Sequence, residues 1–93
     1  MPLYVINAID REGAFETRMA TRPAHLEHVR AHSNVKLAGP FLDEAGQPVG
    51  SMFILEADDI GQVRTFSDND PYVKAGVFDR VEIRAFRIVV GDL

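Results

Sequence analysis

Apolar and polar positions along the chain divide it into six predicted elements, four strands and two helices. Runs rich in β-branched and aromatic residues predict the strands, and apolar residues spaced by three or four predict the helices. The first helix is expected in two pieces, because Thr21 and Arg22 precede Pro23, and proline is favoured in the first turn of a new helix. In chain order, the predictions are a strand at 3–9, helical pieces at 14–20 and 23–32, strands at 35–42 and 51–57, a helix at 60–66 and a strand at 81–90.

Two of the predicted strands contain irregularities. Pro40 has no N–H to donate to a sheet, so it predicts an edge strand or an end to regular pairing. In the same strand, Val35, Leu37 and Phe41 are expected to share one side. The apolar positions of the last strand change parity at 85–86, which predicts a bulge there or a change of burial.

The order strand, helix, strand, strand, helix, strand is typical of a ferredoxin-like split βαββαβ fold of the α+β class. We expect one domain over residues 1–93, with an antiparallel four-stranded sheet and two helices on one face. The strand sequences LYVI and MFIL are apolar on both sides, and no third helix is predicted to cover the second face. A second copy of the chain is the simplest cover, so the sequence predicts a homodimer, sheet against sheet.

Composition narrows the class of partner. Hydrophobic residues make up 46% of the chain and charged residues 26%, as in a globular protein. The net charge is −4 and the basic residues are scattered, which argues against a nucleic-acid partner. No run approaches the ~18 apolar residues of a membrane span, so no membrane partner is expected. The start MPLYVINAID has no basic region before its apolar run, and the chain has no cysteine, so we expect an unprocessed cytoplasmic protein without disulfides.

The predicted topology gathers several polar segments at one end of the sheet. The main helix and the third strand begin at that end, and the second strand and second helix finish there. The segments collected are His25, Gly39-Pro40, Gly50-Ser51 and 68–72, which span nearly half of the chain. Loops that converge on a rigid scaffold are common ligand sites, so we expect a small-molecule pocket at this end.

His25 and Asp70 have the chemistry of a catalytic pair. His25 is expected in the first turn of its helix, where the positive end of the helix dipole favours the neutral ring. Asp70 could contact one ring nitrogen, fix the tautomer and balance the charge after proton abstraction. The simpler alternative is that Asp70 caps the turn that follows, with Pro71 in the first helical position, and the two roles are compatible.

Other polar residues carry a candidate role and an ordinary structural alternative. Arg18 and Arg22 could neutralise an anionic substrate, although a solvated helix face is the default for both. Ser51 is expected to be a hydrogen-bonding residue at the strand start and not a nucleophile, because no elbow motif accompanies it. His28 and His32 form an i, i+4 pair that could join a metal site. Residues 28–32 read HVRAH and not HExxH, and without cysteine we expect no bound metal.

At this point four segments together resemble the YciI-like (YCII-related) family. The most specific signals are a histidine within R-P-x-H-L and an aspartate within D-P-Y-x-x-A-G. The resemblance covers essentially the whole chain, although the hairpin LDEAGQP is shorter than in many members. The segments are RPAHLEHVR at 22–30, LAGPF at 37–41, GSMFILEADD at 50–59 and DNDPYVKAGVFDRVEIRAF at 68–86.

The resemblance implies a dimeric ferredoxin-like α/β barrel with a histidine–aspartate dyad, here His25 and Asp70. It also implies that Ser51 and the Gly39-Pro40 loop border the pocket. A few relatives are linked to the degradation of chlorinated aromatics, where a dehydrochlorinase uses the dyad to remove a proton and expel chloride. The wider barrel group includes muconolactone isomerase-like enzymes and haem- or quinol-handling monooxygenases.

The sequence therefore leads to the hypothesis of a small enzyme without a cofactor, a lyase or isomerase. In it His25 and Asp70 are catalytic, on a small cyclic or enolisable substrate. Two alternatives remain, namely a non-catalytic ligand-binding or regulatory dimer and a domain that works only with a fused or bound partner. The residues expected to bind substrate are Arg22, Gly39, Pro40, Ser51 and Tyr72.

Overall fold

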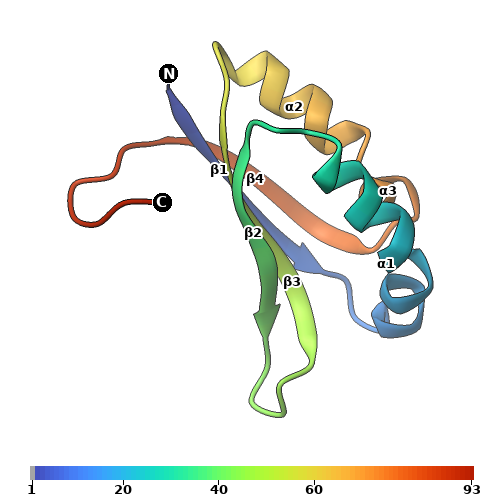
Figure 1. Ribbon diagram of the computed structural model, residues 1–93. Coiled ribbons are helices and arrows are strands. Elements are labelled where there is room, and N and C mark those ends of the chain that lie inside the picture. The colour runs from blue at the N-terminus through green and yellow to red at the C-terminus, as the bar shows by residue number, and fades with distance from the viewer. Residues whose placement is uncertain (1) are drawn as a thin grey trace.

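The computed structural model describes residues 2–93 and contains four strands and three helices (Figure 1). The third helix is a single turn that the sequence pattern predicted only as a turn. The elements are β1 (Leu3–Asp10), α1 (Phe15–Arg30), β2 (Val35–Leu42), β3 (Pro48–Glu56), α2 (Ile60–Asp68), α3 (Pro71–Lys74) and β4 (Phe78–Phe86).

The sheet has the strand order β2-β3-β1-β4, and every neighbouring pair is antiparallel. The helices lie along one face of it (Figure 1). This is the predicted ferredoxin-like βαββαβ arrangement, in the form found in dimeric α/β barrels. β2 is an edge strand, as Pro40 predicted, since an edge position leaves the missing N–H without a required partner.

Helix α1 is continuous, which corrects the prediction of two pieces. It begins at Phe15 and runs to Arg30 with Pro23 inside it. An interior proline removes one backbone hydrogen bond and typically destabilises a helix by about 3 kcal/mol. Packing offsets this loss, because the two buried residues of α1, Arg18 and His25, lie on either side of Pro23 and hold both halves against the fold.

Strand β2 departs from regular alternation near its start. The register with β3 shifts between Val35 and Leu37. Val35 packs against the main core, whereas Leu37 is 48% exposed. The prediction that both share one side with Phe41 is therefore wrong for Val35, because a shift of one residue turns a side chain to the other face.

Strand β4 is displaced from its predicted range of 81–90. It begins at Phe78 and ends at Phe86, so the parity change in the sequence marks the end of the strand and a change of burial. Beyond it, Val89 and Val90 are 83% and 92% exposed. The register irregularity between β1 and β4 lies instead at Ile9 and Asp10.

The main core lies between the sheet and the helices. Its buried side chains come from β1, β3, α2 and Ala57 just after β3, and strand alternation directs those of β1 and β3 to the helical face. A smaller cluster links Ala14, Tyr72 and Val77 beneath the end of α3. The main cluster consists of Ile6, Phe53, Leu55, Ala57, Val63 and Phe66.

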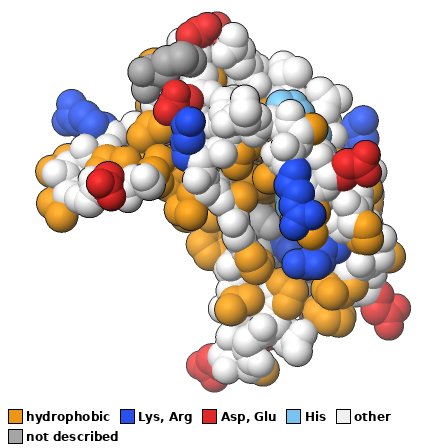
Figure 2. All heavy atoms as spheres, in the orientation of Figure 1, with side chains coloured by type: hydrophobic (Ala, Val, Ile, Leu, Met, Phe, Trp, Pro, Cys, Tyr) orange, Lys and Arg blue, Asp and Glu red, His pale blue; other side chains and the backbone are white. Residues whose placement is uncertain are grey.

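The face of the sheet away from the helices is largely uncovered; it is mostly apolar over β1, β2 and β3, whereas β4 places Arg80, Glu82 and Arg84 on it. Hydrophobic side chains gather along it in Figure 2. Ile9, Leu37 and Phe86 alternate onto this face and are 40%, 48% and 44% exposed. Within residues 2–93, none of the helices combines the length and hydropathy required to span a bilayer.

Candidate functional site

The side chains of His25 and Asp70 meet between α1 and α3. The Nδ1 of His25 lies 2.8 Å from Oδ1 of Asp70, and both residues are buried. A carboxylate can only accept, so Nδ1 carries the proton and donates it to Asp70. When the ring is neutral, the lone pair is then on Nε2, the nitrogen that a general base would use.

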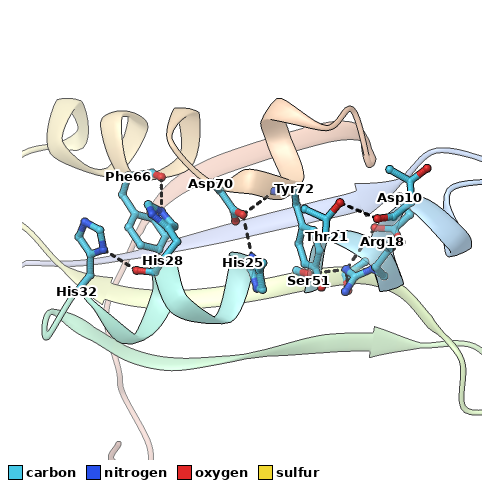
Figure 3. Close-up of polar contacts among 12 residues, drawn as sticks. Asp10, Arg18, Thr21, His25, His28, His32, Ser51, Phe66, Asp70 and Tyr72 are labelled. Carbon is cyan, nitrogen blue, oxygen red and sulfur yellow. Dashed lines mark hydrogen bonds and ion pairs between the residues drawn. The ribbon is translucent and has the colours of Figure 1, made fainter. Parts of the chain in front are cut away.

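Local backbone chemistry fixes the position of Asp70. It is the N-cap of α3, in extended conformation, and its Oδ1 accepts the backbone N–H of Tyr72 at 2.9 Å. Pro71 follows in the first helical position, where its missing N–H is harmless. The same oxygen thus caps the turn and binds His25, so the two alternatives for Asp70 occur together (Figure 3).

Aromatic rings hold the imidazole of His25 in place. The ring of Tyr72 stacks on it with a centroid distance of 3.8 Å and an angle of 14°. Phe53 meets it edge-on at 5.8 Å. His25 is therefore confined by two rings and by Asp70, with little freedom to rotate.

A cavity of about 450 Å³ opens between α1 and the β2–β3 hairpin. This size lies within the range of small-molecule sites. Arg18, Arg22 and His25 line it, and among residues 2–93 no acidic side chain does. Basic side chains are visible in Figure 2 where the hairpin faces the helices. The rest of the wall is mostly apolar and includes Phe15, Met19, Leu26, Val29, Pro48 and Phe53.

All five residues expected to bind substrate line this cavity. Gly39 and Pro40 contribute from β2, Ser51 from β3 and Tyr72 from α3, while Arg22 lies on α1 with an exposed side chain. Gly50 is not in the wall, but its carbonyl accepts a hydrogen bond from Arg18 at 2.7 Å. The predicted convergence of these segments therefore forms one hollow with His25, although the residues lie in strands and helices and not in loops.

The expected placement of His25 at a helix start is wrong. Because α1 begins at Phe15, His25 lies well inside the helix, far from the positive end of its dipole. The argument from the dipole for a neutral ring therefore does not apply. The orientation of the imidazole depends instead on Asp70 and on the stack with Tyr72.

Arg18 is buried, and the prediction of a solvated face is wrong for it. It is only 4% exposed, and its Nε lies 2.8 Å from Oδ2 of Asp10. Its Nη2 donates to the hydroxyl of Ser51 at 2.6 Å. The guanidinium also lies over the ring of Tyr72, with Cζ 4.6 Å from the centroid. Asp10 and this use of Arg18 were not anticipated, because no sequence motif marks their pairing.

Tyr72 is the described residue with a clearly shifted pKa. Burial raises the pKa of its phenol above the ordinary value of 10.0, and the charges of Arg18 and Arg22 oppose the rise. The hydroxyl is therefore protonated at neutral pH. Because both arginines act on it, the positive potential of the cavity extends to this ring.

His28 and His32 lie apart from the cavity. The Nε2 of His28 is 3.0 Å from the carbonyl of Phe66 near the end of α2, and Nδ1 of His32 is 2.8 Å from the carbonyl of His28. Both contacts are those of ring N–H donors. Within residues 2–93, no cluster of three potential metal-ligating side chains occurs.

The sequence model of the YCII-related domain matches residues 2–87, and hence nearly all of the chain.

The chain belongs to the YciI-like, YCII-related family.

Two bacterial relatives agree in length with this YciI-like protein. The protein YciI of Escherichia coli is 35% identical, over 94% of this chain and 98% of the relative. An uncharacterised protein of Haemophilus influenzae is 33% identical, over 92% of this chain and 97% of the relative.

One solved structure similar to this YciI-like chain is that of an enzyme. The 5-chloro-2-hydroxyhydroquinone dehydrochlorinase TftG of Burkholderia phenoliruptrix, in complex with 2,5-dihydroxybenzoquinone, is 28% identical. The TM-score is 0.85, covering 91% of this chain and 93% of the other. A small-molecule enzyme with the same fold is thus among the relatives of the YciI-like family.

The chemistry available to this YciI-like site follows from its walls. An oriented imidazole with a lone pair on Nε2 can take or return a proton. The apolar wall suits a flat ring, and the arginines suit an anion or a group that becomes one. Nothing in this arrangement is a nucleophile with an adjacent base, because the hydroxyl of Ser51 contacts Arg18 and not His25.

Proposed function

We propose that this protein is a small cofactor-independent enzyme of the lyase or isomerase type. His25 acts as the general base and acid, and Asp70 orients it and balances its charge. The substrate is a small cyclic or enolisable molecule. The single observation that supports this proposal is the buried 2.8 Å contact between His25 Nδ1 and Asp70, beside a cavity that His25 itself lines.

Five further residues are proposed to bind the substrate. Arg22 is exposed and basic, and would attract an anionic group to the cavity. Gly39 and Pro40 would form one rim, and Ser51 and Tyr72 would offer hydroxyl groups. The similarity to TftG supports a hydroxylated ring as the substrate class, since that enzyme is named for one.

A dehydrochlorination illustrates the step. In the keto tautomer of a chlorinated hydroxyhydroquinone, Nε2 of His25 would take the proton of an enolic hydroxyl. The oxygen's electron pair would form a carbonyl, the double bond would shift, and chloride would leave with the C–Cl electron pair. The substrate loses HCl, and no redox cofactor is needed. His25 then returns its proton to water.

The test uses 5-chloro-2-hydroxyhydroquinone and, as an isomerase substrate, an enol lactone. Chloride release and lactone conversion are measured for wild type, His25→Gln and Asp70→Asn. A general base contributes roughly 10²–10⁴-fold to a rate, so His25→Gln should lower kcat by about that factor. Asp70→Asn should lower kcat by at least about tenfold, because the variant loses the negative charge that balances the protonated imidazole.

A matched control is His32→Gln, which changes an exposed histidine outside the cavity wall. It should retain the wild-type rate. Wild-type rates in both His25→Gln and Asp70→Asn would end the proposal. Saturable binding by the wild type without turnover of either substrate would favour the alternative, a non-catalytic binding or regulatory protein.

We also propose that the functional unit is a homodimer joined through the open face of the sheet. Leu3, Val5 and Met52 are half-buried on this face, and Ile9 and Leu37 are more than a third exposed. Exposed apolar side chains gathered on one sheet face usually mark an interface, and the charged residues of β4 would lie toward its rim. Light scattering after gel filtration should give twice 10.3 kDa, whereas a monomer at micromolar concentration would contradict the dimer.

A further inference from the structure

Three buried side chains beside the dyad carry hydrogen-bond donors that no described residue uses. They are Arg18, Ser51 and Tyr72, which are 4%, 3% and 1% exposed, and all three line the cavity. Tyr72 lies between His25 and Arg18 in Figure 3. The ring of Tyr72 therefore contacts both the imidazole of His25 and the guanidinium of Arg18.

The contact with Arg18 leaves the proton of the Ser51 hydroxyl free to be donated. A guanidinium can only donate, so in the 2.6 Å contact the serine oxygen accepts from Nη2. Its own proton is then available, and no acceptor for it occurs among residues 2–93. Arg18 cannot turn away, because Asp10 holds its Nε at 2.8 Å and the carbonyl of Gly50 holds its Nη2.

No hydrogen bond of standard geometry joins the hydroxyl of Tyr72 or Nη1 of Arg18 to another residue of the described chain, although the Arg18 guanidinium lies close enough to the phenol to lower its pKa. No completely enclosed polar side-chain atom is left unsatisfied in residues 2–93, so both groups reach open space. The cavity is the open space that both residues line. Burial raises the pKa of the phenol, so it holds its proton and donates.

We propose that the Ser51 hydroxyl, the Tyr72 hydroxyl and Nη1 of Arg18 form an oxyanion site. It takes one anionic oxygen of a planar ring, an enolate or phenolate, while His25 faces the group that gives up the proton. A negative charge on the ligand is favoured because Arg22 lies in the cavity wall and no acidic residue of the described part of the chain does. Buried donors of this kind are preorganised, and therefore bind an anion without reorienting.

The catalytic meaning of this site depends on the proposed function, but its existence does not. Binding of 2,5-dihydroxybenzoquinone, an anion at neutral pH, is measured by absorbance titration. The wild type should bind it, and Tyr72→Phe and Ser51→Ala should each weaken Kd by about tenfold to a hundredfold. Hydroquinone, a neutral ring of similar size, should bind equally to the wild type and both variants.

Matched controls separate the site from general damage. Tyr4→Phe removes a hydroxyl from a tyrosine at the core edge, and Ser67→Ala removes one from a buried serine outside the cavity. Both should keep the wild-type Kd. An unchanged Kd in Tyr72→Phe and Ser51→Ala, an equal loss for hydroquinone, or no binding by the wild type would overturn the site. Intact anion binding by a wild type that turns nothing over would refute only the acid–base function.

Discussion

Oδ1 of Asp70 lies 2.8 Å from Nδ1 of His25, although the two residues are 45 positions apart, and it also holds the N–H of Tyr72. The aspartate therefore links three things at one atom: the tautomer of the imidazole, the first turn of α3 and the position of the tyrosine ring. Structural and chemical roles of Asp70 can be separated because serine and asparagine also cap helices.

Substitutions of Asp70 should lower the free energy of unfolding according to which of its two contacts, with the N–H of Tyr72 and with His25, the new side chain can replace. Asp70→Ala removes the cap, which costs about 1 kcal/mol, and leaves a buried imidazole donor unpaired, which costs about 1–3 kcal/mol more. Asp70→Ser should recover the cap alone, and Asp70→Asn should recover both contacts. Urea unfolding checks this order. Equal stability of the alanine and asparagine variants would contradict it.

The pair of Arg18 and Asp10 should be a strong stability determinant. Both side chains are over nine-tenths buried, so Asp10→Ala would leave a buried guanidinium without its carboxylate, destabilising the fold by about 3–5 kcal/mol. In a double-mutant cycle with Arg18→Met, the combined loss should be smaller than the sum. Glu82→Ala, at an exposed pair with Arg84, serves as control and should change stability by less than about 1 kcal/mol. Additive losses in the buried cycle would show that the two residues do not act together.

Gly50 should tolerate no side chain. A Cβ there would lie 2.5 Å from the carbonyl oxygen of Ala8 on the neighbouring strand. Gly50→Ala must therefore push the strands apart, and we expect a loss of about 1–3 kcal/mol in thermal unfolding. Gly39→Ala is the matched change, because its Cβ would meet nothing within 4 Å, and it should be neutral within about 0.5 kcal/mol. A neutral Gly50→Ala would mean that the β1–β3 contact is looser than described.

Stability should fall at high pH partly through Tyr72. Its pKa is raised by burial above 10.0, the ordinary value, so the folded state keeps the phenol proton when the unfolded chain begins to lose it. The contribution of Tyr72 to the free energy of unfolding is therefore fully present below about pH 10 and is lost as the pH rises through the folded-state pKa. Tyr72→Phe should flatten this decline in urea unfolding between pH 9 and 11, about the range of phenol ionisation. Tyr4→Phe tests whether any tyrosine has the same effect, and an identical decline in wild type and Tyr72→Phe would refute the assignment.

The order of elements, the edge position of β2 and the capping of α3 could be predicted from the sequence. These depend on local chemistry, such as the alternation of apolar residues, the missing N–H of Pro40 and the pairing of Asp70 with Pro71. The meeting of His25 with Asp70 could be predicted only as a convergence at one end of the sheet, together with a family resemblance. The error at Pro23 shows the limit of local rules, since packing held α1 together across a residue that ordinarily breaks helices.

By itself, the sequence determined the order of the predicted strands and helices and the capping of α3 by Asp70. Tertiary structure alone decided that Arg18 is buried against Asp10, that the Ser51 hydroxyl accepts from Arg18 and that Tyr72 stacks on His25. The physical reason is that propensities act over a few residues along the chain. The burial of a cation, by contrast, becomes favourable only when carboxylate, carbonyl and hydroxyl partners from distant strands arrive around it together.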